Sequence, residues 1–280
     1  MRIAIMGAGG VGGCLGGLLT KAGNRVSLIV RGEHLQAICE NGLKLVRPDG
    51  EFVVEVEATD DPSEIGPVDL VLFCVKTFQN RHMITNLKPL MGHETSFITL
   101  QNGVESHEQL GAVLGPSNIL PGAYWGSSHI VAPGVIGEDV EARISFGEVD
   151  DTDSLRALEI RKVFRDAGIE TELSPDPFGV LWEKFIVLSA LAGITSAAQT
   201  RPKELLKFPD ARKLFCDAME EALAVGLAKG VDLPANIVQD SLKYIDSLPD
   251  FQNSMQGDYE AGRPTELDAL SGAVIRLGKQ

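Results

Sequence analysis

One lysine stands inside a long apolar stretch, and this placement favours proton-transfer chemistry. Lys184 is the only charged residue between Glu183 and Arg201. A segment that is apolar on nearly all faces is typical of a buried helix. Its amine therefore lies either at the helix edge, with the stem packed and the charge in water, or inside a cleft. A cleft lysine with a carboxylate partner can act as a general acid.

Two further polar residues follow strands of the first half. Lys76 comes directly after an apolar strand that ends in Cys74-Val75, and Asn102 follows the strand of residues 97–100. The carboxyl ends of parallel strands face the ligand crevice of an open α/β sheet. There, a lysine could bind a cofactor or a substrate carboxylate, and an amide could hold a nicotinamide or a substrate. The alternatives are a solvated loop lysine and an ordinary Asn-Gly turn.

Polar residues near the C-terminus have simple local explanations. Thr265 can cap a helix that carries Glu266 in its first turn. Ser254 and Asp258 fit the surface of a helix. The histidines show no metal-ligand spacing, so we predict no metal site.

A glycine-rich turn at the N-terminus predicts a nucleotide site. Residues 2–6 form an apolar strand, Gly7, Gly9 and Gly12 follow at G-x-G-x-x-G spacing, and a helix continues from residue 11. The first glycine allows a tight turn, the second admits a pyrophosphate, and the third allows close helix–strand packing. The alternative is a purely structural turn. The predicted cofactor-binding residues of this turn are Gly7, Gly9, Gly10, Val11 and Gly12.

Arg31 selects the type of dinucleotide. It follows the second strand, residues 25–30, where an NAD site usually places an acid for the ribose hydroxyls. The planar guanidinium suits a phosphate instead. We therefore predict NADPH as the cofactor, with a solvated strand-end arginine as the alternative.

Composition excludes several classes of protein. The net charge of −14 and a pI near 4.8 argue against nucleic acid and anionic membranes as partners. The chain starts directly with a strand, and the apolar run at residues 185–198 is short for a membrane span. The scattered cysteines, with no disulfide or metal spacing, are expected to be buried thiols of a cytoplasmic protein.

The order of elements predicts two domains. Strands are expected at residues 2–6, 25–30, 43–46, 51–58, 70–74, 95–99, 119–123 and 169–173, and helices at 11–21, 34–41, 78–90, 105–114 and 155–167. This alternation is typical of an α/β Rossmann-like, doubly wound sheet, closed by an antiparallel hairpin within residues 134–148. After it, helices are expected at 178–199, 202–208, 210–229 with Asp210 as its cap, 234–246 and 265–277. We predict a dinucleotide-binding domain at 1–174 and an all-α substrate domain at 175–280.

Seven short segments occur in a specific order along some 260 residues: Gly7-Ala8-Gly9-Gly10-Val11-Gly12, Arg31-Gly32, Val75-Lys76-Thr77, Gln101-Asn102-Gly103-Val104, Trp182-Glu183-Lys184, Ser254-Met255-Gln256-Gly257-Asp258 and Gly262-Arg263-Pro264-Thr265-Glu266-Leu267-Asp268. Together they resemble the ketopantoate reductases, also called 2-dehydropantoate 2-reductases. The resemblance implies NADPH in a cleft and Lys184 as general acid. It places Glu266 as catalytic partner near the cofactor, Glu266 and Ser254 beside the substrate, and Lys76 and Asn102 near both cofactor and substrate.

The chain departs from that family at one wall. Well-known members carry asparagines one and two turns after the catalytic lysine, whereas this chain has Leu188 and Ala192. An apolar wall discriminates weakly for a substrate hydroxyl. The expected reaction is NADPH-dependent reduction of a 2-keto acid to the 2-hydroxy acid, with 2-dehydropantoate, of the pantothenate pathway, as the leading substrate. The alternatives are a more apolar 2-keto acid and a non-catalytic NADPH sensor. The expected partners are this small molecule and, as one option, a second copy of the chain in a homodimer.

Overall fold

A computed structural model describes residues 1–149 and 154–280, which form two compact units. The first unit comprises Met1–Gln101 and Ser106–Pro177, and the second comprises Asn102–Glu105 and Phe178–Gln280. The sequence placed the change of domain after residue 174. The short segment Asn102–Glu105 groups with the helical unit, although it lies between elements of the first.

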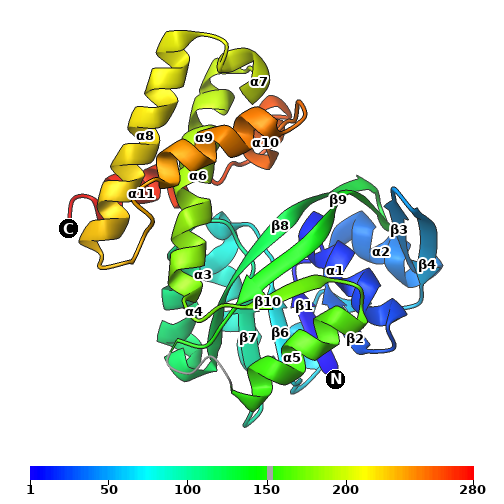
Figure 1. The fold of residues 1–280 in the computed structure, drawn as a ribbon. Coiled ribbons are helices and arrows are strands. Elements are labelled where there is room, and N and C mark those ends of the chain that lie inside the picture. Colours follow the sequence, from blue (N-terminus) through cyan, green and yellow to red (C-terminus); the bar gives the residue numbers. More distant parts are fainter. Residues whose placement is uncertain (150–153) are drawn as a thin grey trace. The chain divides into compact units, whose positions relative to one another are not determined.

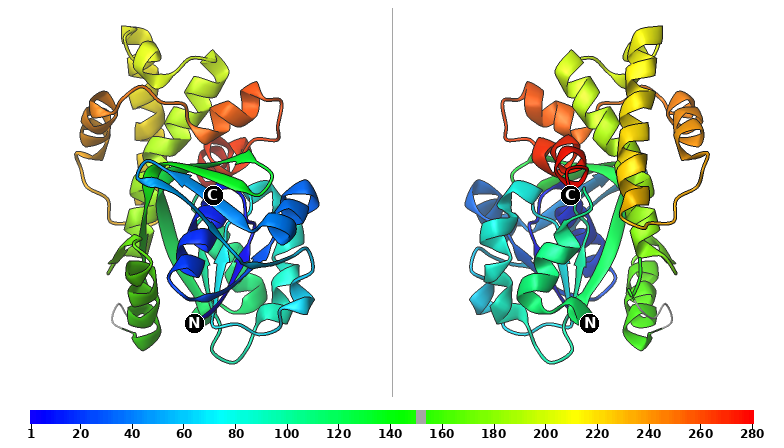
Figure 2. Two further views of the ribbon diagram at one scale, coloured as in Figure 1. Left: turned by 90° about the vertical axis from the view of Figure 1, so that its right-hand side faces the viewer. Right: turned by 90° about the vertical axis from the view of Figure 1, so that its left-hand side faces the viewer.

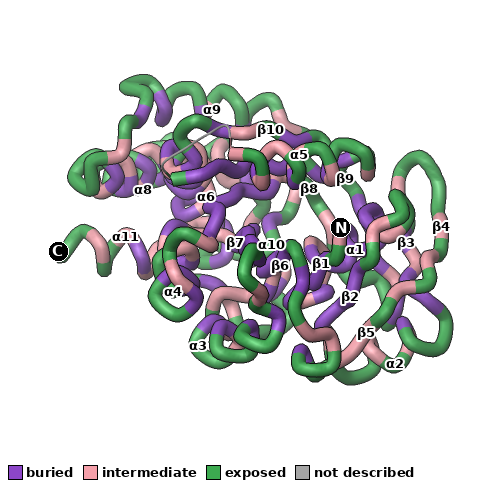
Figure 3. Tube along the Cα trace, turned by 90° about the horizontal axis from the view of Figure 1, so that it is seen from below, coloured by how far each residue is buried: buried purple, intermediate pink, exposed green. Residues whose placement is uncertain are grey.

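Six strands of the first unit form a parallel sheet in the order β5-β2-β1-β6-β7-β8 (Figure 1). Their bounds are β1 Arg2–Met6, β2 Arg25–Ile29, β5 Glu57–Thr59, β6 Leu70–Phe73, β7 Ser96–Thr99 and β8 Ile119–Ala132. All four residues of β6 and of β7 are buried, and Figure 3 shows this centre of the sheet in purple. Continuous apolar runs suit strands that are covered on both faces. The predicted doubly wound sheet is confirmed.

The sheet continues through four strands whose pairing differs from the prediction. These are β3 Leu43–Arg47, β4 Gly50–Val54, β9 Val135–Phe146 and β10 Glu170–Leu173. The antiparallel hairpin is not contained within residues 134–148, because all of β9 is one strand that pairs with β8. The strand predicted at 119–123 is longer than expected, since pairing with β9 extends β8 to Ala132. The predicted strand at 51–58 is two strands, since β4 pairs with β3 and β5 pairs with β2.

Helices cover both faces of the parallel sheet. They are α1 Gly10–Lys21, α2 Gly32–Asn41, α3 Asn80–Met83, α4 Ser106–Leu114 and α5 Leu155–Asp166, with 3₁₀ turns η1 Pro62–Glu64, η2 Thr77–Gln79, η3 Thr85–Leu90 and η4 Pro116–Asn118. One core joins α1 and α5 to the sheet, and a second joins η3 and α4 to its other face. The single helix predicted at 78–90 is wrong. It is broken into η2, α3 and η3, and Pro89, inside η3, cannot donate a backbone hydrogen bond.

The described part of the second unit is helical, as predicted (Figure 2). Its elements are α6 Pro177–Ala198, α7 Pro202–Leu205, α8 Pro209–Ala228, α9 Ile237–Ser247, α10 Ser254–Glu260, η5 Leu267–Ala269 and α11 Ser271–Leu277. Asp210 is not the cap of α8, because the helix starts at Pro209 and Asp210 lies in its first turn. The helix expected at 234–246 starts only at Ile237. The one expected at 265–277 is broken at Leu270, between η5 and α11.

The exposure of the cysteines and of helix α6 tests two expectations about the class of protein. Cys39 is exposed on α2, so the prediction of buried thiols fails there, while Cys14 is buried. Helix α6 is, by length and composition alone, apolar enough to cross a membrane. However, 56% of its most apolar window is buried inside the protein, as in the core helix of a soluble domain. It lines, with α7, α8, η5 and α11, an apolar pocket of about 460 Å³.

Candidate functional site

The glycine turn between β1 and α1 has the geometry of a pyrophosphate-binding loop. Gly7 has φ +97°, and a Cβ on it would lie 2.7 Å from Val75 Cγ1. A Cβ on Gly12 would lie 2.2 Å from the Gly7 carbonyl oxygen, so only glycine allows this closeness of helix and strand. Gly9, in contrast, faces open space, with no heavy atom within 4 Å of its added Cβ. Gly7 and Gly12 therefore allow close packing of the backbone, whereas Gly9 leaves room for a ligand at the helix N-terminus.

Gly10 and Val11 open α1 beside this turn. A Cβ on Gly10 would lie 2.2 Å from the Ser128 carbonyl oxygen, so β8 backs the first turn of the helix closely. The Gly13 N–H donates to the Gly9 carbonyl at 2.7 Å, which starts the helical ladder there. The backbone N–H groups of the first turn have no partner within the helix, and they suit an anion.

Arg31 is exposed at the N-cap of α2, and it makes no side-chain hydrogen bond or ion pair with any residue in the described ranges. One turn further, His34 links two loops. Its Nδ1 accepts from the Gly134 N–H at 2.8 Å, so Nε2 carries the proton and donates to the Ala8 carbonyl at 3.1 Å. Burial lowers the pKa of His34, which favours this neutral form. Sequence reasoning missed this contact because it joins residues far apart in the chain.

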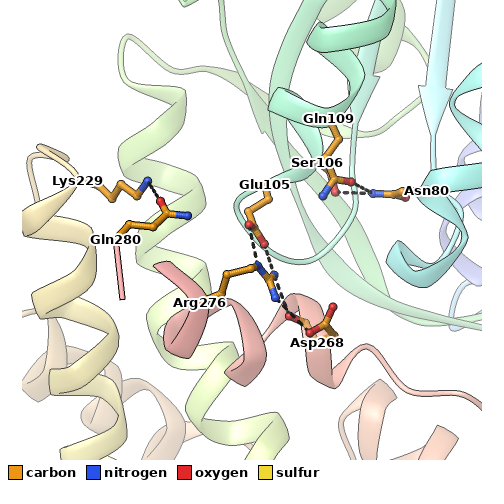
Figure 4. A network of polar contacts seen from close by, with 8 residues as sticks. All are labelled: Asn80, Glu105, Ser106, Gln109, Lys229, Asp268, Arg276 and Gln280. Carbon is orange, nitrogen blue, oxygen red and sulfur yellow. Dashed lines mark hydrogen bonds and ion pairs between the residues drawn. The ribbon is translucent and has the colours of Figure 1, made fainter. Parts of the chain in front are cut away.

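Lys76 is half-buried and lies at the N-cap of η2, three residues after the end of β6 at Phe73. The strand ends beside it are held by Gln101, whose Nε2 donates to the Val75 carbonyl at 2.6 Å and to Asn80 Oδ1 at 2.7 Å. Asn80 in turn donates to Ser106 Oγ and Gln109 Oε1, as Figure 4 shows. This buried network holds Val75 against Gly7, and therefore shapes the glycine turn. Asn80 was not among the predicted site residues.

In the helical unit, two predicted residues, Asn102 and Glu266, lie near Lys184. Its Nζ donates to Asn102 Oδ1 at 3.0 Å. Burial lowers the pKa of Lys184 to about 8, and the charge of Glu266 opposes that shift. Glu266 is itself 5% exposed and occupies the N-cap position of η5. A desolvated ammonium with an amide acceptor and a nearby carboxylate is suited to give up a proton near neutral pH.

Ser254 is exposed at the first position of α10. The residue before it, Asn253, donates from Nδ2 to Thr195 Oγ1 at 2.6 Å and caps α10 through the Gln256 N–H. Thr195 belongs to α6, so this bond holds the start of α10 against the lysine-bearing helix. Asp258 is not a surface residue as expected, because it is buried and pairs with Arg263.

The two apolar residues that follow Lys184 differ in exposure. Leu188 is half-buried, whereas Ala192 is completely buried. Of this pair, Leu188 alone offers accessible surface on the face of α6 that carries Lys184. Within residues 1–149 and 154–280, no group of three His, Cys, Asp or Glu side chains is arranged to hold a metal ion.

The sequence and the fold match those of known proteins. The sequence profile "Ketopantoate reductase PanE/ApbA" matches residues 3–151, and the profile of its C-terminal part matches residues 178–280. The chain belongs to the ketopantoate reductase family. Members of this family are oxidoreductases that use a pyridine nucleotide, typically NADP, and act on small keto acids.

The matches extend over the whole chain. A 2-dehydropantoate 2-reductase of Mesorhizobium japonicum is 31% identical over 306 residues, covering 100% of this chain and 92% of that protein. The crystal structure of a 2-dehydropantoate 2-reductase from Geobacter metallireducens has a TM-score of 0.94 at 33% identity and covers 100% of this chain and 93% of its own. A PanE/ApbA family ketopantoate reductase from Ralstonia eutropha has a TM-score of 0.93 at 30% identity, with 100% and 92% covered.

The predicted site residues of this family member thus fall into two sets. The first unit holds Arg31, Lys76 and the glycine turn, and the second holds Lys184, Asn102, Glu266 and Ser254. The grouping of Asn102 is unexpected, because it follows a strand of the sheet in sequence yet belongs to the helical unit, where it accepts a hydrogen bond from Lys184.

Proposed function

We propose that this protein reduces a 2-keto acid to the 2-hydroxy acid with NADPH, and that 2-dehydropantoate is its leading substrate. The observation that carries the proposal is the Lys184 amine, bonded to Asn102 and with its pKa lowered to about 8. A solvent-exposed lysine would stay protonated well above pH 8. A group that releases its proton near neutral pH suits the protonation of a developing alkoxide.

The glycine turn fits a dinucleotide. Gly9 leaves space beside the N-terminus of α1, while Gly7 and Gly12 allow the close backbone packing that this turn requires. The exposed Arg31 supports NADPH, because its guanidinium has no ion pair with the described residues and can bind the additional phosphate of that cofactor. When bound, the cofactor supplies the hydride that the carbonyl carbon receives.

The residues of the chain supply the proton and the orientation. The ammonium of Lys184 donates a proton to the carbonyl oxygen as the hydride reaches carbon, which leaves a neutral amine and a 2-hydroxy acid. Asn102 accepts one hydrogen bond of that ammonium and so directs its remaining protons. The negative charge of Glu266 favours the charged amine before transfer. Ser254, exposed at the start of α10, is the candidate donor to the substrate.

The substrate's side chain would meet Leu188, one helical turn from Lys184. This contact supports the alternative of a 2-keto acid more apolar than 2-dehydropantoate. The second alternative is an NADPH-binding sensor without turnover, which would need neither a titrating lysine nor its carboxylate. For the leading substrate, the product is pantoate and the protein serves pantothenate biosynthesis in the cytoplasm, as a monomer or a homodimer.

A turnover screen tests this proposal. The full chain is mixed with NADPH or NADH and a panel of 2-keto acids, including ketopantoate and 2-keto-isovalerate, and absorbance at the reduced-nicotinamide band is followed. Loss of absorbance with one or more acids, faster with NADPH, is expected. Tight NADPH binding in a fluorescence titration with no turnover of any acid would favour the sensor.

A further inference from the structure

Arg276, on α11, binds both Glu105 and Asp268 (Figure 4). Its Nη2 and Nε donate to the two carboxylate oxygens of Glu105, at 2.6 and 3.3 Å. Its Nη1 donates to Asp268 Oδ1 at 3.1 Å, and Nη2 also donates to the Asp268 carbonyl at 3.2 Å. One guanidinium therefore holds a loop through Glu105 and a 3₁₀ turn through Asp268.

Both partners are close in sequence to residues of the proposed site. Glu105 ends the segment Asn102–Glu105, whose Asn102 bonds to Lys184. Asp268 lies in η5, whose cap is Glu266 and whose Ala269 N–H bonds to the Glu266 carbonyl at 3.1 Å. The segment and the turn also approach directly, since a Cβ on Gly103 would lie 2.9 Å from the Ala269 carbonyl oxygen.

The geometry requires arginine. A bidentate pair with Glu105 and two further bonds to Asp268 use both terminal nitrogens and Nε in the plane of the guanidinium, which a lysine ammonium cannot reproduce. Stability is a poor explanation for this arrangement. The Arg276 side chain is 41% exposed and that of Asp268 is 94% exposed, and exposed ion pairs contribute little to folding. The Glu105 side chain is the more buried partner, at 21%.

We infer that Arg276 is a positioning residue, which holds Asn102 and Glu266 in their places around the Lys184 amine. The inference rests on the proposed function, since Lys184 is the acid of that reaction. Arg276 acts through Glu105 on the Asn102 segment, and through Asp268 on the turn that Glu266 caps. Loss of the guanidinium frees both segments, and a small displacement of a positioning group has a large effect on rate.

The first test measures the Lys184 amine itself and needs no turnover. Competitive labelling with an acylating reagent, read by mass spectrometry, gives the relative reactivity of Lys184 in the parent and in Arg276→Gln, Asn102→Ala and the double variant. Arg276→Gln should change the reactivity in the same direction as Asn102→Ala. The double variant should change the reactivity by less than the sum of the two single variants, because part of the effect of Arg276 acts through Asn102. Lys213→Gln, which removes an exposed pair with Asp217 on α8, is the matched control and should change nothing.

The second test is kinetic. With an accepted 2-keto acid, Arg276→Gln should lower kcat by about tenfold to a hundredfold, and Arg276→Lys should recover only part of it. The Kd of NADPH should stay within about twofold. Hydrogen exchange of the peptide spanning residues 102–105 should accelerate in Arg276→Gln, with the unfolding midpoint retained.

The outcomes separate this inference from the proposed function. Unchanged Lys184 reactivity and unchanged exchange in Arg276→Gln overturn the positioning role, whatever the turnover. Additive effects of Arg276→Gln and Asn102→Ala on reactivity also overturn it. A parent protein that turns over no 2-keto acid overturns the proposed function, while the labelling and exchange results still decide whether Arg276 holds this site.

Discussion

The pH dependence of turnover tests the role of Lys184 most directly. With a pKa of about 8, the ammonium fraction falls from about 0.9 at pH 7 to about 0.1 at pH 9. If the ammonium is the proton donor, kcat/KM for the keto acid should be level at low pH and fall about tenfold per pH unit well above pH 8. The profile of kcat/KM for the keto acid is the relevant one because it reports groups of the enzyme before the keto acid binds.

Glu266→Gln is the decisive perturbation. The carboxylate raises the pKa of Lys184, against the larger lowering by burial. Its removal leaves burial unopposed, so the pKa falls and the alkaline limb of the profile moves to lower pH. Lys184→Ala should lose about 10²–10⁴ in turnover, as expected for a general acid, while NADPH binding is retained. The exposed Lys213→Ala serves as the control, and its profile should match the parent.

Stopped-flow or steady-state rates between pH 6 and 10, with NADPH saturating, provide the assay. An alkaline limb that does not move in Glu266→Gln would show that the two groups are not coupled or that another group titrates. Turnover of Lys184→Ala close to that of the parent would refute the general-acid assignment. It would favour the alternative, in which the stem of Lys184 packs at the helix edge and its amine lies in water.

Three further outcomes are expected. Arg31→Ala should weaken NADPH by about 1.5–3 kcal/mol more than NADH in fluorescence titrations, and equal binding of both cofactors by the parent would contradict this. Leu188 cannot hydrogen-bond a substrate hydroxyl, so the ratio of kcat/KM for ketopantoate to that for 2-keto-isovalerate should stay below about a thousandfold in the parent. This ratio should rise in Leu188→Asn. A larger ratio in the parent would show that other residues bind the hydroxyl. The lowered pKa of Lys184 should make the stability of the parent protein in urea titrations depend on pH. Lys184 keeps its proton up to about pH 10.5 in the unfolded chain but only to about pH 8 in the folded protein, so the free energy of unfolding of the parent should rise between these pH values. A free energy of unfolding that is constant over this range would contradict the lowered pKa of Lys184.

The parts of the fold that could be predicted are those specified by local pattern. The apolar strands β1, β6 and β7 and the glycine turn are visible in sequence, because buried parallel strands need continuous apolar runs. The errors come from tertiary pairing. Whether residues 51–58 form one strand or two depends on which neighbours they pair with, and the length of β8 depends on β9.

The candidate site shows the same division. The residues of the glycine turn and Lys184 could be predicted, since glycine spacing and a lone charge in an apolar helix are local signals. The contacts that orient them could not. His34 bonds to Ala8 and Gly134, and Gln101 bonds to Asn80, over separations that no periodicity reports.

Asn102 shows why position along the chain is an incomplete guide to position in a site. It follows β7, where the rule for open sheets predicts a ligand contact at the carboxyl edge. The residue on its N-terminal side, Gln101, lies at that edge and hydrogen-bonds to Val75 and Asn80, which follow the neighbouring strand β6. Asn102 instead bonds to Lys184, and the segment it begins is held by Arg276 through Glu105. A single peptide bond thus separates a residue that shapes the glycine turn from one that orients the proposed acid. Substitution of either side chain should therefore affect one property alone. Gln101→Ala should raise the Kd of NADPH, and Asn102→Ala should lower kcat.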